Sequence, residues 1–328
     1  MSSSVVASGP AKPVKPTVPI WSKIHKGDEI AHLVTFLFAA SVLLVTVMLV
    51  AQLWTNSAPS RAHLGWGFFW GSDWDAVTDK FGAAPFVYGT ILTSVLALMI
   101  SVPLGVGAAI FLAELAPPRL ANACTFLVEL LAAVPSVIYG LLAIFTLIPL
   151  LREYGEPFLR KTLGFLPWFR GPAMGIGYLA AGLILAVMTF PYIIAISRES
   201  LLEVPNDQRE AALALGATRW ESTSQVVVPY ARLGILGSVF LGLARALGET
   251  MAVTMVIGNS PTIKASLFAP GYTIAAVVAN EFTEATGQIY LSSLVELGLV
   301  LFLITIIVNA LARLLVIATS RKGTAHSA

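Results

Sequence analysis

The sequence predicts an all-α integral membrane protein with six transmembrane helices. Of its 328 residues, 57% are hydrophobic and 12% are charged, and the mean hydropathy is +0.82. A soluble domain has about a quarter of its residues charged, so this composition indicates a membrane protein. Apolar runs long enough to cross a bilayer, which requires about 20 residues, occur at 30–53, 86–113, 122–150, 173–196, 231–257 and 289–312.

Composition also limits the function classes. The formal net charge of +2 is too small to indicate nucleic-acid binding. Cys124 is the single cysteine, so no internal disulfide can form. The four histidines lie near the two ends of the chain without ligand spacing, and we expect neither a metal nor a cofactor on this chain.

The two ends are predicted to be tails rather than domains. Residues 1–29 are polar and carry a proline at every third position from Pro10 to Pro19, so we expect a disordered cytoplasmic tail. The apolar run 30–53 is longer than the core of a signal peptide and is predicted to remain as the first transmembrane helix. Residues 316–328 are predicted to form a second cytoplasmic tail.

The distribution of Lys and Arg predicts the orientation. If the N-terminus is cytoplasmic, twelve positive residues lie on the cytoplasmic side and seven on the outer side. Cytoplasmic loops carry the excess of Lys and Arg. We therefore expect both termini in the cytoplasm.

The polar loop 198–230 is the longest on the predicted cytoplasmic side, and its pattern predicts two helices, at 207–216 and 218–229. Asp207 with Glu210, and Thr218 with Glu221, have the spacing of capping boxes. Gly216 is expected to end the first helix and Pro229 the second.

The pattern of this loop allows three interpretations. In the simplest, Glu210 only caps a helix, and the alanines only favour one. DNA binding fails because the second helix offers one cation, Arg219, where phosphate contacts need several. A docking helix is the third interpretation, in which the small Ala211 and Ala212 allow close approach and Arg209 and Glu210 supply polar anchors.

Two charged residues fall inside the predicted span 231–257. An ionised Arg245 near the middle of a bilayer is costly and needs a partner or water. Glu249 follows four residues later, so on a continuous helix the two side chains share a face. In one interpretation the pair only holds the helices together. In the other, Arg245 lies on the path of an oxyanion, whose geometry suits a planar guanidinium, and Glu249 holds Arg245 until the helices rearrange.

Other residues in the spans have packing as their main expected role. Glu129 and Glu296 lie nearer the ends of their spans and are expected to snorkel or to pair with a neighbouring helix, with a transport role as the less favoured alternative. Small residues in the fifth span are expected to allow close helix packing; they are Gly234, Gly237, Ser238 and Gly242.

No catalytic motif is recognisable. ATP hydrolysis would need a G-x-x-x-x-G-K-[ST] loop, and the nearest match, at 155–162, has Arg160 at the second glycine and Pro157 inside. The chain is therefore not expected to be an enzyme. Any ATP and magnesium would be bound by a partner chain.

The loop resembles the EAA loop of the permeases of ABC importers. The matching elements are Glu210-Ala211-Ala212, Gly216 four residues later, and Val226-Val227-Val228-Pro229 after a further nine. Valines replace the usual Ile and Leu. The resemblance implies the type I importer permease (MetI-like) fold over residues 84–315, with the loop as a coupling helix that docks in a cleft of an ATPase.

A second resemblance is to the PstC family of phosphate-importer permeases. It rests on Leu241 to Val253 with Ile257-Gly258-Asn259, on Phe81 to Pro85 before Gly89-Thr90, and on Glu129 with Pro135 to Gly140. It implies a bacterial inner-membrane location and a transport role for Arg245 and Glu249. The implied partners are a PstA-like second permease, a dimer of a PstB-like ATPase and a PstS-like phosphate-binding protein.

Two alternatives remain at this point. One is a permease for another oxyanion, such as molybdate or sulfate. The other is an ion-coupled secondary transporter that uses Arg245 and Glu249 as a proton-linked pair. The second alternative would have no reason to carry an EAA loop.

Overall fold

The computed structural model describes residues 21–324, and the side chains of residues 30–314. The chain divides into residues 1–52 and residues 53–328, the latter called here the bundle unit. The described part of the first unit belongs to one helix, α1 (Trp21–Asn56), whose apolar stretch Ile30–Asn56 is unburied. Helix α1 thus begins inside the stretch predicted as a tail, and residues 1–20 lie outside the described ones.

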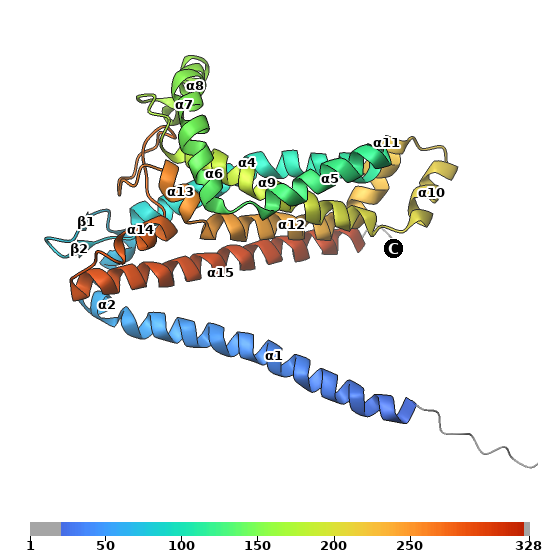
Figure 1. Ribbon diagram of the computed structural model, residues 1–328, viewed down its shortest axis with the longest axis horizontal. Helices are drawn as coiled ribbons and strands as arrows, with labels where there is room; N and C mark the ends of the chain where they lie inside the picture. The colour runs from blue at the N-terminus through green and yellow to red at the C-terminus, as the bar shows by residue number, and fades with distance from the viewer. Residues whose placement is uncertain (1–20, 325–328) are drawn as a thin grey trace, which may run out of the picture. The chain divides into compact units, whose positions relative to one another are not determined.

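The described part of the bundle unit consists of helices, connecting loops and one β-hairpin whose two strands have two residues each (Figure 1). Its longer helices are α4 (Ala84–Ile110), α5 (Pro118–Ala133), α9 (Tyr178–Leu202), α12 (Val228–Gly248) and α15 (Gln288–Thr324). Shorter helices are α2 (Ala58–Leu64), α3 (Gly67–Trp70), α6 (Ser136–Leu142), α7 (Ile148–Leu150), α8 (Glu156–Leu163), α10 (Asn206–Ala214), α11 (Arg219–Ser222), α13 (Met251–Val256) and α14 (Ile274–Glu281). Helix α15 continues into the stretch predicted as the C-terminal tail.

Several helices are joined by single π-helical turns. These turns are η1 (Phe111–Leu115), η2 (Ala143–Leu147), η3 (Leu151–Gly155) and η5 (Thr223–Val227), and η4 (Pro167–Phe169) is a 3-10 turn. The strands β1 (Trp74–Asp75) and β2 (Lys80–Phe81) pair antiparallel, with Trp74 opposite Phe81. A π turn inserts one residue into the hydrogen-bond ladder and so re-aims the next helix.

Six helical stretches in the described residues are long and apolar enough to cross a membrane, as the sequence predicted. They are Ile30–Asn56, Ala84–Leu115, Ser136–Leu163, Tyr178–Leu202, Arg219–Gly248 and Gln288–Leu314. The chain is therefore a multi-pass membrane protein of all-α class.

The predicted third span, 122–150, is wrong as a single helix. Helix α5 ends at Ala133, Val134 is extended, and α6 starts at Ser136. Pro135 lies at the break because it cannot donate a backbone hydrogen bond and disfavours helix in the residue before it. The stretch that qualifies as a span follows this break and continues to Leu163.

The predicted fifth span, 231–257, is also displaced. It begins earlier, because Arg219 to Gly248 form one continuous stretch in which Pro229 occupies the first turn of α12. It also ends earlier, because Glu249 is extended (φ −70°, ψ 129°) and a separate short helix, α13, starts at Met251.

Helix α9 is the centre of the bundle unit. Its apolar window is 67% buried, and it packs against α4, α5 and α12. Ser197 of α9 and Ser238 of α12 share a buried hydrogen bond of 2.7 Å. A Cβ placed on Gly234 would lie 2.1 Å from Ser200 Oγ, and one on Gly242 would lie 3.2 Å from Ile193.

The predicted packing role of the small residues is therefore confirmed at Gly234, Ser238 and Gly242. Gly237 differs, since a Cβ there would meet nothing within 4 Å. Small residues allow helices to approach closely in a bilayer, where apolar burial gives no net attraction.

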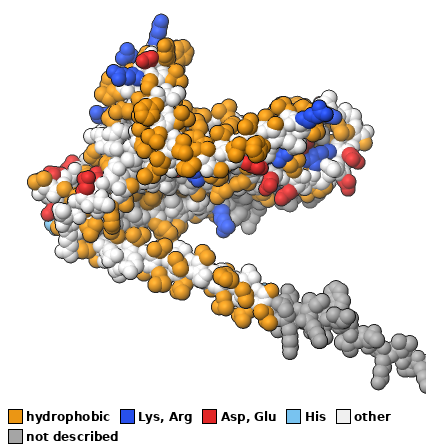
Figure 2. Space-filling model, in the orientation of Figure 1, with side chains coloured by type: hydrophobic (Ala, Val, Ile, Leu, Met, Phe, Trp, Pro, Cys, Tyr) orange, Lys and Arg blue, Asp and Glu red, His pale blue; other side chains and the backbone are white. Residues whose placement is uncertain are grey.

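The two ends of the bundle unit differ in character. Figure 1 shows α10 and α11 at one end, and the β1–β2 hairpin with α14 at the other. Figure 2 shows hydrophobic side chains along the flanks and charged side chains gathered around α10–α11 and near α7–α8. This arrangement is that of a bundle with an apolar girdle and two polar ends.

Candidate functional site

Helix α10 extends from one end of the bundle and has no buried residue. It begins at Asn206 after Pro205, so the predicted cap by Asp207 is wrong, and Asp207 lies in the first turn. Gly216 has φ +91° and follows the last turn, where its N–H donates to Leu213 O at 3.0 Å. The prediction that Gly216 ends this helix is confirmed, because glycine adopts positive φ without steric cost.

Arg209 ties α10 to the bundle. Its guanidinium donates to Glu114 Oε1 at 2.8 Å and to Leu201 O at 2.7 Å, and also to Val204 O. Glu114 belongs to η1, at the end of α4, and Leu201 belongs to α9. The side chains of Arg209 and Glu114 are 18% and 9% exposed, so this is a mostly buried ion pair.

The prediction that Arg209 serves as an outward anchor is therefore wrong. Its donors face inward, and one guanidinium connects the ends of two long helices to α10. A planar fork with five N–H donors can bridge several acceptors in this way, whereas a lysine ammonium is a single point charge.

The outer surface of the loop is formed by other residues. Glu210 and Ala211 are exposed and Ala212 is half-buried. Large apolar side chains of the same loop also have much of their surface in solvent: Leu215 is 91% exposed, Trp220 59% and Leu213 44%. The surface made by Glu210, Ala211 and these three side chains is called here the α10 face. Several exposed large apolar side chains in one polar loop are typical of a protein interface.

The second predicted helix of the loop is part of a longer element. Thr218 and Glu221 form the predicted capping box: Glu221 N donates to Thr218 Oγ1 at 3.3 Å, and Thr218 N to Glu221 Oε2 at 2.7 Å. Helix α11 then continues through η5 into α12 without an end at Pro229. The loop is therefore connected directly to the transmembrane helix that carries Arg245.

Arg245 does not pair with Glu249. The guanidinium carbon of Arg245 lies 4.4 Å from the ring centroid of Tyr192 in α9, and its buried Nε has no hydrogen-bond partner. Glu249 instead accepts a 3.3 Å hydrogen bond from Ala252 N, at the start of α13. The expected ion pair fails because Gly248 ends the helix, and the i, i+4 geometry requires a continuous one.

Tyr192 connects Arg245 to the break between α5 and α6. Its hydroxyl donates to Ala132 O at 2.9 Å, and Tyr139 donates to Leu131 O at 2.8 Å. These carbonyls belong to the last turn of α5, where the break removes the regular i+4 donors and Val134 N donates to Leu131 O at 3.3 Å. Two tyrosine hydroxyls thus satisfy the backbone of an interrupted membrane helix, as a bilayer requires.

Sequence reasoning missed Tyr192 altogether and noted Tyr139 only within a family motif. The one available signal was a tyrosine next to Pro191 inside an apolar span, where its hydroxyl needs a partner. Helix α13 packs closely against α6, since a Cβ on Gly140 would lie 2.5 Å from Met255 Sδ. The two helix breaks and Arg245 therefore form one cluster, called here the break cluster.

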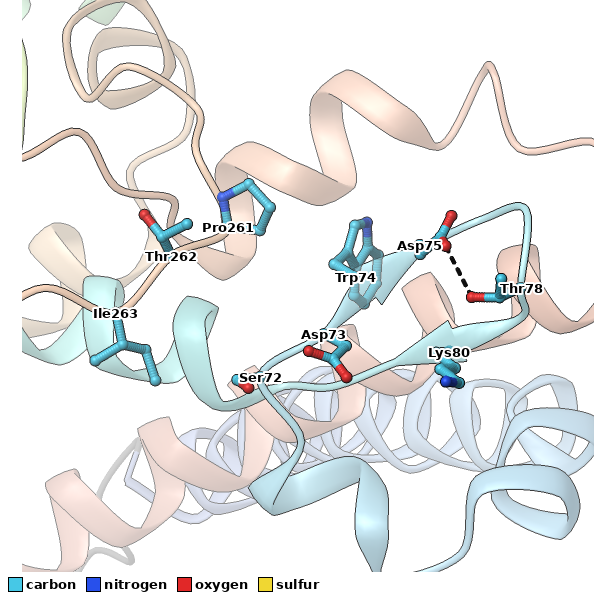
Figure 3. A pocket seen from close by; sticks show the side chains of 9 residues that line it. All are labelled: Ser72, Asp73, Trp74, Asp75, Thr78, Lys80, Pro261, Thr262 and Ile263. Atoms are coloured by element: carbon cyan, nitrogen blue, oxygen red, sulfur yellow. Dashed lines mark hydrogen bonds between the residues drawn. The ribbon is translucent and has the colours of Figure 1, made fainter.

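A groove of about 770 Å³ opens at the hairpin end of the bundle unit (Figure 3). Asp73, Asp75 and Lys80 lie on its hairpin side, and the segment 261–263 lies opposite. Asp75 accepts hydrogen bonds from Val77 N at 2.9 Å and Thr78 Oγ1 at 2.8 Å, which lower the pKa of its carboxyl. The exposed hairpin is thereby held in one conformation by its own side chain.

The hairpin is fixed to the helices by Glu281 of α14. Trp74 Nε1 and the Tyr290 hydroxyl both donate to Glu281 Oε2 at 2.7 Å. Trp74 also packs edge-on against Phe86, with ring centroids 4.6 Å apart. The groove therefore has a rigid wall.

The family model for binding-protein-dependent transport system inner membrane components matches residues 101–321, more than half of the chain. The chain belongs to this family. Members are membrane components of transport systems that depend on a binding protein, so this chain is a permease subunit. An independent secondary transporter is thus not favoured.

Individual relatives and a solved structure support the same family and fold. The phosphate transport system permease protein PstC of Mesorhizobium japonicum is 46% identical over 290 residues, covering 87% of this chain and 89% of the relative. The PstC of Xylella fastidiosa is 45% identical over 294 residues, covering 87% and 90%. A bacterial alginate ABC transporter, solved with a periplasmic protein bound to an alginate pentasaccharide, matches at 13% identity and TM-score 0.57, covering 89% and 95%. The permease therefore has the fold of ABC importer permeases.

Proposed function

We propose that this permease is the membrane-spanning subunit of an ATP-driven importer of inorganic phosphate. The observation that carries the proposal is the identity of 44–46% with PstC relatives over most of both chains. The permease forms half of the translocation pathway. A PstA-like second permease supplies the other half.

The α10 face is the proposed docking site for the ATPase. Glu210, Ala211, Ala212 and Gly216 match the EAA pattern, and the first two are exposed on a helix that extends beyond the bundle. ATP and magnesium are bound by two copies of a PstB-like ATPase. The permease itself is non-catalytic and receives the motion of the ATPase through α10.

Arg209 and α11 are the proposed routes by which that motion enters the membrane. Arg209 connects α10 to the ends of α4 and α9. Helix α11 continues into α12, which carries Arg245. A displacement of α10 would therefore reach the break cluster through packed, hydrogen-bonded elements.

Arg245 is the proposed transport residue in the pathway. Its guanidinium is held against the Tyr192 ring but forms no ion pair in the described part of the chain, so its charge is available to an oxyanion. Glu249 has a different proposed role, since it accepts from the backbone of α13 and marks the helix break that lets this region rearrange.

The proposed orientation places the N-terminus, the C-terminus and α10 in the cytoplasm of a bacterial cell. The hairpin end then faces outward, and a PstS-like phosphate-binding protein docks on 54–85, 151–172 and 258–288. The groove beside Trp74 lies within the first and third of these segments.

Uptake of labelled phosphate by vesicles that contain the reconstituted complex tests the substrate. We expect ATP-dependent uptake that is inhibited by unlabelled phosphate. Sulfate and molybdate should lower the uptake rate by less than about twofold. Stronger inhibition by sulfate or molybdate than by phosphate would assign the permease to another oxyanion.

A further inference from the structure

A cavity of about 260 Å³ lies between the α2–α3 segment and α15, away from both the α10 face and the break cluster. Its wall includes Trp54, Arg61, Trp66, Phe69 and Glu296. All of these residues belong to the bundle unit. Neither the proposed transport pathway nor the ATPase docking site uses them, although four of the five lie within segment 54–85, which is proposed to contact the phosphate-binding protein.

Glu296 is the unusual member of this wall. It is 1% exposed, and neither of its carboxylate oxygens forms a hydrogen bond of normal geometry, although the Ser60 hydroxyl and the Arg61 guanidinium are close enough to interact with it. It also forms no ion pair with any described residue. A buried acidic group without an ion-pair partner is unfavourable inside a membrane protein and typically marks a binding site.

Arg61 supplies the opposite charge on the same wall. Its guanidinium stacks over Trp54 at 3.7 Å, Nε donates to Ser57 Oγ at 3.2 Å, and Nη2 donates to Trp54 O. Within the described part of the chain, Nη1 has no acceptor. The cavity thus presents an unpaired carboxylate and a held guanidinium with a free donor, which together are complementary to a zwitterion with one cationic and one anionic group.

The cavity lies where the apolar spans end. Helix α1 ends at Asn56, and Glu296 lies eight residues, roughly 12 Å, into α15. Trp54 and Trp66 are 55% and 83% exposed. Exposed tryptophans at the end of a span are typical of the headgroup level of a bilayer.

We propose that this cavity binds the headgroup of phosphatidylethanolamine, with the ammonium on Glu296 and the phosphate on Arg61. Room for about nine water molecules, at about 30 Å³ each, fits the eight non-hydrogen atoms of a phosphoethanolamine group. Trp66 and Phe69, whose rings lie 5.8 Å apart, add aromatic surface for the cationic end. Phosphatidylglycerol lacks the ammonium group, and phosphatidylcholine lacks N–H donors and is larger.

Native mass spectrometry of the full-length permease, delipidated in detergent and then mixed with one lipid at a time, tests this proposal. We expect phosphatidylethanolamine to be retained at least fivefold more than phosphatidylglycerol or phosphatidylcholine. Glu296→Gln and Arg61→Gln should each remove that preference. Glu284→Gln, at an exposed position outside the spans, is the matched control and should keep it.

Retention of phosphatidylethanolamine by Glu296→Gln at the wild-type level would overturn the proposal, as would equal retention of the three lipids by the wild type. If Glu296→Gln fails to fold, brominated phosphatidylethanolamine provides a second measurement on the wild type and on Trp66→Phe. Quenching of tryptophan fluorescence should fall in the variant, and unchanged quenching would contradict the site.

Discussion

At the scale of single residues, Arg209 shows how a loop at the membrane surface is made rigid. One guanidinium satisfies the Glu114 carboxylate and two backbone carbonyls at the C-terminal end of α9. Removing this guanidinium leaves the mostly buried Glu114 carboxylate without an ion-pair partner. The free energy of unfolding then falls by more than the bond itself contributed.

Arg209→Ala is therefore expected to lower the stability of the permease by about 1.5–3 kcal/mol and to reduce ATP-driven uptake more than assembly. Arg209→Lys should restore little of this stability or uptake, because an ammonium group cannot reproduce the several directed hydrogen bonds of a guanidinium. Thermal unfolding in detergent, co-purification of the ATPase and uptake are the three measurements. Arg219→Ala, an exposed arginine in the same loop, is the control, and an equal loss there would contradict the bridging role of Arg209.

Arg245 and Glu249 have different environments, so their variants should behave differently. Arg245→Gln removes the charge proposed to meet phosphate and should reduce uptake at least tenfold. Glu249→Gln keeps an amide oxygen that can accept from Ala252 N and should reduce uptake less than threefold. Labelled phosphate uptake at matched amounts of assembled complex measures both.

Arg232→Gln provides the comparison on the same helix, because it removes a positive charge 13 residues away from Arg245. Normal uptake by Arg245→Gln would show that this arginine is structural only.

At the scale of elements, helix contacts depend on glycines whose positions the sequence alone does not distinguish. Gly89 and Gly107 both lie in α4, but a Cβ on Gly89 would lie 2.1 Å from the backbone oxygen of Tyr272, whereas one on Gly107 would meet nothing within 4 Å. Backbone cannot move aside as a flexible side chain can.

Gly89→Ala is expected to destabilise the bundle by about 1–3 kcal/mol through overpacking. Gly107→Ala is expected to be neutral or to stabilise it by up to about 1 kcal/mol, since alanine favours the helix. Thermal unfolding of the two variants side by side measures the difference. A similar melting temperature for both would show that the segment around Tyr272 is not packed as described.

The helices could be predicted from the sequence, but several of their boundaries could not. The six spans and the capping box at Thr218 follow from composition and local spacing, which act within a few residues. The breaks at Val134 and Glu249 do not follow in this way. At Val134, the hydroxyls of Tyr139 and Tyr192 donate to the carbonyls of Leu131 and Ala132, and Tyr192 lies 60 residues from its acceptor. The inward role of Arg209 likewise depends on Glu114, 95 residues away.

At the scale of the whole molecule, the bundle unit has two polar ends joined by an apolar girdle, and the proposed transport direction depends on which end is cytoplasmic. The excess of Lys and Arg on the α10 side predicts that α10 and both termini share the cytoplasmic side.

Cysteine labelling tests this topology. After Cys124 is replaced by Ala, single cysteines at Gln208 and Val77, both exposed, are treated in intact cells with a membrane-impermeant maleimide. We expect labelling at position 77 and protection at position 208 until the cells are opened. The reverse pattern would invert the proposed orientation.

The central claim is that this permease imports phosphate by docking an ATPase on the α10 face. The most direct measurement is co-purification of the ATPase with Leu215→Asp and with Val77→Asp, two substitutions at side chains that are each 91% exposed but lie at opposite ends of the bundle unit. We predict that the ATPase co-purifies with the wild type and with Val77→Asp, and is lost at least tenfold from Leu215→Asp together with ATP-driven phosphate uptake. Retention of the ATPase and of uptake by Leu215→Asp, or purification of the wild-type permease with no ATPase, would contradict the account.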